Sequence, residues 1–155
     1  METRAGIAGH PIHPMLIPFP IALWIFSLAS DLIYLFGFGG AVWKDIALYT
    51  MAGGIIGGLA AAIPGYIDYR SLSDPVIVRV AQMHMVINVG LIVLFTINTG
   101  LRFLNGPEAL LPVLLSVLGV AALAVSGWLG GELVYVQGVA VQPEREPTAP
   151  KRRAA

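Results

Sequence analysis

The sequence has no cysteine and little charge. Without cysteine the chain can form no disulfide, iron–sulfur cluster, thiolate metal site or covalently attached c-type haem. Only 12% of its 155 residues are charged, against roughly 25% in an ordinary soluble domain. Nine Lys and Arg balance nine Asp and Glu, so no broad basic face exists to bind nucleic acid. The motifs of a nucleophile elbow, a phosphate-binding loop and a zinc protease are also absent, and no classical enzyme is indicated.

Apolar residues dominate what is present. They make up 57% of the chain, with a mean hydropathy of +0.80. A soluble domain of this length could not bury so many apolar side chains. Four apolar runs each reach about 20 residues, the length that crosses roughly 30 Å of hydrocarbon as a helix. They predict a membrane domain over 1–141, with spans at about 15–36, 46–68, 79–103 and 109–136. Residues 142–155 form a polar, basic, proline-rich tail that we predict to be disordered.

Short polar segments separate the four spans, as is typical of neighbouring antiparallel helices. The predicted fold is an all-α integral membrane protein, an antiparallel four-helix transmembrane bundle in the lipid bilayer. This threading places seven basic residues on the side of the two termini and only Lys44 and Arg102 on the other. Because cytoplasmic ends carry the excess of Lys and Arg, we expect both termini to be cytoplasmic. The expected location is the bacterial inner (cytoplasmic) membrane, as a multi-pass protein.

Small residues gather in the second and fourth spans. The second contains Gly53, Gly54, Gly57, Gly58, Ala61 and Ala62, and the fourth contains Gly127 and Gly131. Small residues four apart let two helices approach closely, so tight packing is one interpretation and room for a flat cofactor is the other. An exposed glycine-rich face would also allow a homodimer. No internal repeat is evident in the sequence, which therefore does not predict the inverted repeats of a transporter.

A polar stripe runs along the third span. Asn88, Asn98 and Arg102 follow His84 by 4, 14 and 18 residues, which puts all four on one face of a helix. This face must turn toward the bundle interior, because lipid would leave its polar groups without partners. Asp31 of the first span lies at the depth of Arg102, and we predict that these two residues form a structural ion pair.

Histidines and carboxylates gather at the other end of the bundle, on the predicted cytoplasmic side. They are His10, His13, His84, Asp68 and Glu132. Imidazole and carboxylate groups bind metals, so all five are candidate metal ligands and the three histidines are candidate cofactor ligands. Prolines surround His10 and His13, fixing φ and removing backbone donors, so we expect a stiff, non-helical segment there. The alternative is that these histidines only hydrogen-bond headgroups or neighbouring carbonyls.

Four blocks of the sequence occur in a characteristic order. They are Gly-His-Pro-Ile-His-Pro-Met-Leu from position 9, Ala-Ile-Pro-Gly-Tyr-Ile-Asp from position 62, His84 with Asn88, and Ser-Gly-Trp-Leu-Gly-Gly-Glu-Leu-Val-Tyr from position 126. Together they resemble a bacterial family of predicted four-helix membrane proteins, domain of unknown function 2231, over about residues 6–141. The resemblance implies four spans and an inner-membrane location. Many members have histidine where Pro18 and Gln137 stand here. Some are fused to Rieske-type iron–sulfur domains, which implies electron transfer by analogy.

Three hypotheses of function are compatible with the sequence. In the first, a membrane-embedded redox protein binds b-type haem through His84 and either His13 or His10, and passes electrons to a partner protein. In the second, zinc or iron is bound at the cytoplasmic face by the histidines with Glu132 or Asp68. In the third, the protein is a non-catalytic scaffold or partner subunit. The aromatic residues expected to surround a haem are Phe19, Trp24, Trp128 and Tyr135.

Overall fold

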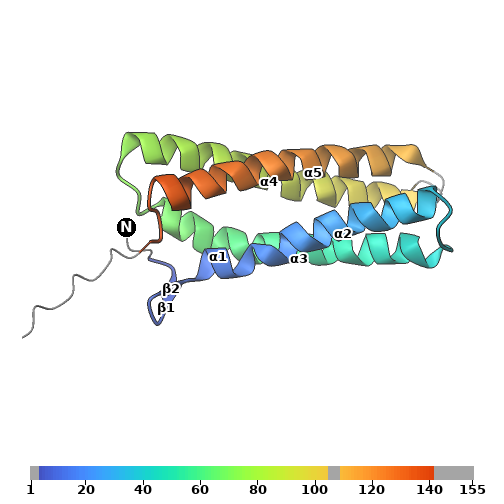
Figure 1. The fold of residues 1–155 in the computed structure, drawn as a ribbon, viewed down its shortest axis with the longest axis horizontal. Coiled ribbons are helices and arrows are strands. Elements are labelled where there is room, and N and C mark those ends of the chain that lie inside the picture. The colour runs from blue at the N-terminus through green and yellow to red at the C-terminus, as the bar shows by residue number, and fades with distance from the viewer. Residues whose placement is uncertain (1–3, 105–108, 142–155) are drawn as a thin grey trace, which may run out of the picture.

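The computed structural model describes residues 4–104 and 109–141, in which four long helices lie side by side (Figure 1). The elements are β1 (Gly6–Ile7), β2 (His10–Pro11), α1 (Ile12–Leu16), α2 (Pro18–Leu35), α3 (Val42–Tyr69), α4 (Pro75–Leu104), α5 (Leu110–Gly131) and the π-helix η1 (Glu132–Val136). β1 and β2 pair as a short antiparallel hairpin at one end of the bundle. The tail predicted at 142–155 lies outside the described residues.

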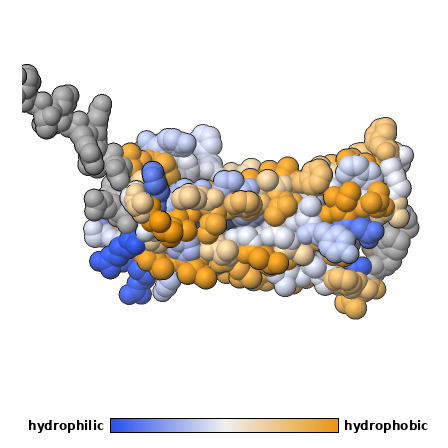
Figure 2. Space-filling view, turned by 90° about the horizontal axis from the view of Figure 1, so that it is seen from below, coloured by the Kyte–Doolittle hydropathy of each residue, from blue (hydrophilic) through white to orange (hydrophobic). Residues whose placement is uncertain are grey.

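Each long helix can cross a membrane by its length and composition. The four candidate spans are Ile12–Leu35, Val42–Tyr69, Pro75–Leu104 and Leu110–Val136, with 24, 28, 30 and 27 residues. On the face shown in Figure 2, hydrophobic residues lie along the whole length of the molecule, and the most hydrophilic residues lie toward its two ends. Trp128 is exposed, whereas Ser126 and Asp31 are buried. Apolar groups outside and polar groups inside are what a hydrocarbon solvent requires.

Local sequence explains where the helices begin and end. Pro18 has no N–H to donate to the preceding turn, and the first span is divided there into α1 and α2. Gly37, with φ of +75°, follows the end of α2 in a left-handed conformation that suits glycine. The Asp74 carboxylate accepts a hydrogen bond from the Val76 N–H at 2.8 Å, which caps the first turn of α4.

Consecutive helices run in opposite directions (Figure 1). Between α2 and α3, the Ser27 hydroxyl donates to the Ala47 carbonyl at 2.7 Å, and Trp24 Nε1 donates to the Met51 carbonyl at 3.3 Å. Later residues of α2 therefore meet earlier residues of α3. Figure 1 shows α4 and α5 related in the same way.

The first span and α4, in contrast, run in the same direction and meet at equivalent positions. Three contacts join them, and the members of each are 71 positions apart: His13 with His84, Trp24 with Phe95, and Asp31 with Arg102. Glycines beside these side chains are 65 positions apart on α3 and α5: Gly54 with Gly119, and Gly65 with Gly130. A single offset shows only that the two helices are parallel and in register. Because the glycine contacts match as well, the two hairpins are packed internally in the same way, as an approximate two-fold axis requires. The bundle thus consists of two helical hairpins related by an approximate two-fold axis parallel to the helices.

This internal repeat is not evident in the sequence. Few equivalent positions carry the same residue, and some contacting pairs are complementary rather than identical, such as Asp31 with Arg102. Outward-facing positions need only be apolar to suit lipid, so they can diverge without cost. The two halves therefore match in the register of their helices, although most matching positions carry different residues.

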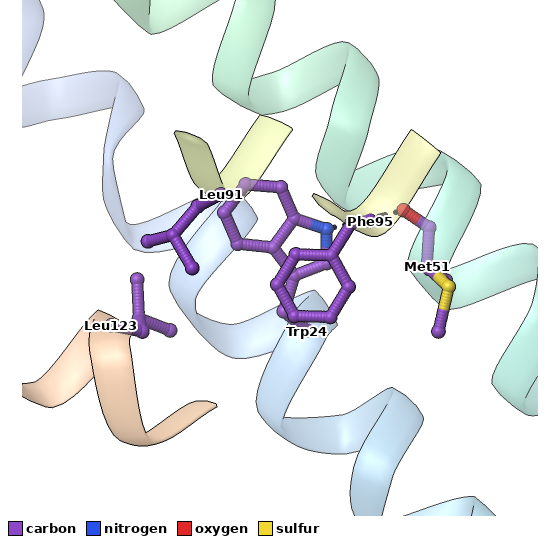
Figure 3. Close-up of a cluster of buried hydrophobic side chains, with 5 residues drawn as sticks. All are labelled: Trp24, Met51, Leu91, Phe95 and Leu123. Carbon is purple, nitrogen blue, oxygen red and sulfur yellow. Dashed lines mark hydrogen bonds between the residues drawn. The ribbon is translucent and has the colours of Figure 1, made fainter. Parts of the chain in front are cut away.

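The middle of the bundle is packed around an aromatic pair. Trp24 stacks on Phe95 with ring centroids 4.4 Å apart, and Leu91, Leu123 and Met51 surround them (Figure 3). A Cβ atom at Gly54 would lie 2.4 Å from Trp24 Nε1, and one at Gly119 would lie 2.6 Å from Phe95 Cζ. These glycines make room for rings from the neighbouring helix. In the fourth span the two glycines of the predicted packing pair do not pack against another helix, because a Cβ atom at Gly127 would meet nothing within 4 Å and one at Gly131 would meet only Tyr135, at 4.0 Å.

Candidate functional site

His13 lies on helix α1, which corrects the expectation of a non-helical segment. Pro11 precedes the helix with extended backbone angles, φ of −71° and ψ of 127°, and Pro14 falls in its first turn. The N–H groups of a first turn have no acceptor within the helix, so a proline there removes no helical hydrogen bond. His10 alone of the two remains outside a helix, in strand β2.

His13 and His84 come together across the two-fold axis. Their ring centroids are 6.3 Å apart, and the ring planes are nearly perpendicular, at 87°. One ring comes from the first hairpin and the other from the second, at equivalent positions. Both side chains are partly buried at the end of the bundle that carries the β-hairpin.

Backbone carbonyls fix the tautomer of both rings. Nδ1 of His13 lies 2.8 Å from the Ala61 carbonyl oxygen, and Nδ1 of His84 lies 2.9 Å from the Ser126 carbonyl oxygen. A carbonyl oxygen has no hydrogen, so each Nδ1 carries the proton and donates it. The neutral rings therefore keep a lone pair on Nε2, the ring nitrogen that these two hydrogen bonds leave unused. This arrangement is typical of histidines that bind a metal.

Two glycines form the walls against which the rings pack. A Cβ atom at Gly65 would lie 2.7 Å from His13 Nδ1, and one at Gly130 would lie 3.2 Å from His84 Cε1. Each glycine sits four residues after the residue whose carbonyl holds the ring, Ala61 in α3 and Ser126 in α5. One helical turn therefore supplies both the acceptor and the space for its imidazole.

A second group of hydrogen bonds surrounds His84. Asn88 Nδ2 donates to the Ser126 hydroxyl oxygen at 2.6 Å and to the His84 carbonyl at 2.8 Å. The same hydroxyl oxygen lies 3.2 Å from His84 Nδ1. This part of the polar stripe thus turns toward the bundle interior, as the sequence predicts, and there it contacts α5.

The other predicted ligands do not join this pair in a metal site. His10 is exposed in β2, and the Asp68 carboxylate accepts a hydrogen bond from the Ala5 N–H at 2.9 Å. Glu132 begins the π-helix η1. Within residues 4–104 and 109–141, no group of three His, Cys, Asp or Glu side chains could hold one metal ion. The carboxylate of Asp68 instead anchors the N-terminal segment, while the hairpin leaves the His10 side chain exposed.

Asp31 and Arg102 form an ion pair toward the end of the bundle opposite the histidine pair. Arg102 donates from both terminal nitrogens to the Asp31 carboxylate, with one of the two distances at 2.8 Å. The Asp31 side chain is fully buried and that of Arg102 is 10% exposed. Ser116 joins the pair to Asn98, because its hydroxyl oxygen accepts from Arg102 at 3.2 Å and from Asn98 Nδ2 at 2.9 Å.

Three of the four aromatic residues predicted to line a haem face outward. Phe19, Trp128 and Tyr135 are 60%, 79% and 89% exposed. Trp24 is buried, but it stacks on Phe95 in the middle of the bundle. The histidine pair is therefore bounded by glycine backbone rather than by the aromatic rings that sequence reasoning chose.

Comparison of the sequence with protein families identifies the group to which these features belong. Residues 9–143 match the family described as predicted membrane protein (DUF2231). The chain belongs to this family. No match was found among curated proteins or among solved structures. In this DUF2231 chain the matched region contains both histidines of the pair, their carbonyl acceptors and their glycines.

Sequence reasoning missed Gly65, Gly130 and the role of Ser126. All three lie in the blocks that carry the family resemblance, Pro-Gly-Tyr and Ser-Gly-Trp-Leu-Gly-Gly. The signal available was a glycine one helical turn after a small residue, in each of two helices. Nothing in that spacing says that an imidazole from another helix will occupy the space.

Proposed function

We propose that this DUF2231 protein is a membrane-embedded haem protein that transfers electrons, with His13 and His84 as the axial ligands of a b-type haem. The observation that supports this most is the pair of imidazoles whose Nδ1 atoms both donate to carbonyls. Haem bound between them supplies a one-electron couple. A redox partner protein is part of the proposal.

The spacing of the rings suits one metal ion between them. The ring centroids are 6.3 Å apart, a separation that would allow both imidazoles to bind one metal ion, since metal–nitrogen bonds are about 2.0–2.1 Å long. We assign His13 rather than His10 as the second ligand beside His84, because His10 is exposed in the hairpin.

The number of ligands favours haem over a zinc or non-haem iron site. A structural zinc ion takes four ligands from the protein, and the described residues bring no three suitable side chains together. In haem the macrocycle surrounds the iron, and the protein adds only axial ligands. Two imidazoles are enough to bind haem iron, but they are too few for a structural zinc site.

An absorption spectrum of the protein purified in detergent from haem-replete cells tests the proposal. We expect a Soret band that shifts on reduction and is lost in both His13→Ala and His84→Ala. His10→Ala is the matched control and keeps the band. A colourless wild-type protein that contains no haem overturns the proposal, and elemental analysis of the same preparation shows whether zinc or iron is bound instead.

A structural role is the second candidate, because each histidine joins two helices. His13 ties α1 to α3 and His84 ties α4 to α5 through the carbonyl bonds. A scaffold subunit predicts that His13→Ala lowers the melting temperature while no pigment or metal is lost. Loss of pigment from a folded variant rules this role out as the sole function.

We also infer that the histidine end of the bundle faces the cytoplasm of the inner membrane. Arg4, Arg70 and Arg79 lie at this end, and cytoplasmic ends carry more Lys and Arg. The absence of native cysteine permits a direct test with Ala8→Cys and Gly40→Cys. A membrane-impermeant maleimide should label Gly40→Cys in intact cells and Ala8→Cys only after permeabilisation. The reverse pattern contradicts this orientation.

A further inference from the structure

The two halves of the repeat hold their histidines differently. Ser126 and Ala61 occupy equivalent positions, and both accept the Nδ1 proton through the backbone carbonyl. Only Ser126 adds a hydroxyl, at 3.2 Å from His84 Nδ1. Asn88, which orients that hydroxyl at 2.6 Å, is equivalent to Ile17 in the first half. His84 Nδ1 therefore has a side-chain hydroxyl and a side-chain amide nearby, whereas the matching positions near His13 carry alanine and isoleucine.

We propose that Asn88 and Ser126 are positioning residues that make His84 the more firmly held and more strongly electron-donating axial ligand of the pair. This inference rests on the proposed function. The Ser126 hydroxyl oxygen offers the Nδ1 proton a second acceptor, and Asn88 keeps that oxygen in place by donating to it and to the His84 carbonyl. Stronger acceptors at Nδ1 raise the basicity of the other ring nitrogen, and loss of such partners typically weakens metal binding 10–100-fold.

The Ser126 hydroxyl is buried, so it must be hydrogen-bonded within the protein. Ser126 is 1% exposed, and a buried hydroxyl is costly unless it is hydrogen-bonded. Asn88 meets that requirement. Ser126→Ala removes only the hydroxyl, because the backbone carbonyl of residue 126 still accepts from His84 and Asn88 still donates to the His84 carbonyl. The variant should therefore fold.

Nitrogen-15 NMR of histidine-labelled protein without haem tests the hydrogen bonds independently of cofactor binding. We expect Nδ1–H tautomers for both His13 and His84 in the wild type. Ser126→Ala and Asn88→Ala should move the His84 Nδ1 signal and leave that of His13 unchanged. Ala61→Ser is the matched control in the other half, and it should move the His13 signal alone. Unchanged signals in Ser126→Ala overturn the inference.

Titration of the same detergent-solubilised proteins with haemin tests the consequence for the ligand. Ser126→Ala should bind haemin about 10-fold more weakly than the wild type and have a higher reduction potential, because a less basic imidazole stabilises ferric iron less. Ser126→Thr keeps a hydroxyl and should restore both values. If the wild type binds no haemin while the NMR shifts occur as expected, the proposed function fails and the assignment of positioning residues stands. If haemin binds equally to the wild type and Ser126→Ala, the inference fails and the proposed function stands.

Discussion

Replacing Arg102 with leucine leaves the Asp31 carboxylate without the guanidinium that neutralises it. Both terminal nitrogens of Arg102 donate to this carboxylate, which is fully buried, whereas the Arg102 side chain is 10% exposed. Removing one partner of a buried ion pair costs about 3–5 kcal/mol of folding free energy, because the remaining charge is buried without compensation. We expect Arg102→Leu to destabilise the protein by about that amount.

Removing Asp31 instead of Arg102 should lower the free energy of unfolding by a smaller amount. In Asp31→Leu the remaining guanidinium keeps the Ser116 hydroxyl as an acceptor, and a long side chain near a helix end can reach the membrane interface. The double variant Asp31→Leu/Arg102→Leu should lie near the wild type, because replacing a whole buried pair with apolar residues is often neutral. The double-mutant cycle then gives a strong favourable coupling between the two side chains.

Reversible unfolding in detergent measures these free energies. Thr96→Leu, at an exposed position of the same helix, is the control and should shift the free energy of unfolding by less than about 0.5 kcal/mol. An Arg102→Leu variant as stable as this control would refute the reasoning. So would a double variant whose loss equals the sum of the two single losses.

Four other substitutions test the packing of the bundle and the anchoring of its N-terminal segment. If the proposed haem is bound, Gly65→Ala should abolish its Soret band while the helical circular dichroism is kept, because a Cβ atom would lie 2.7 Å from the His13 ring. Gly130→Ala should have a smaller effect, because its Cβ atom would lie 3.2 Å from the His84 ring. Gly127→Ala, with open space around it, should change neither signal. Gly54→Ala should lower the free energy of unfolding by about 1–3 kcal/mol, as overpacking does, because the new atom would lie 2.4 Å from Trp24 Nε1; an unchanged thermal midpoint in detergent would contradict this. Asp68→Leu removes the acceptor of the Ala5 N–H and should speed hydrogen exchange at that amide, whereas equal exchange rates would mean that the carboxylate does not anchor the segment.

The family blocks and the candidate histidines could be read from the sequence, but the geometry that pairs two of these histidines could not. The sequence placed His13 and His84 at the same end of the bundle and among the candidate ligands. It also grouped them with His10, Asp68 and Glu132, since residue type and depth were the only criteria available. In the structure His13 lies in a five-residue helix and His10 in a two-residue strand, and local propensity near four prolines gave no sign of that division.

By itself the sequence determined the features that follow from the solvent. Hydrocarbon satisfies no polar group, so apolar runs become helices long enough to span it and a polar stripe must turn inward to find partners. For the same reason the buried charges of Asp31 and Arg102 each needed a partner within the bundle. The tertiary structure alone decided which imidazoles face one another, which glycines receive them and that two hairpins repeat about an axis. Those outcomes depend on the rotation and register of helices 65 and 71 positions apart in the chain, and no local pattern of residues fixes either quantity.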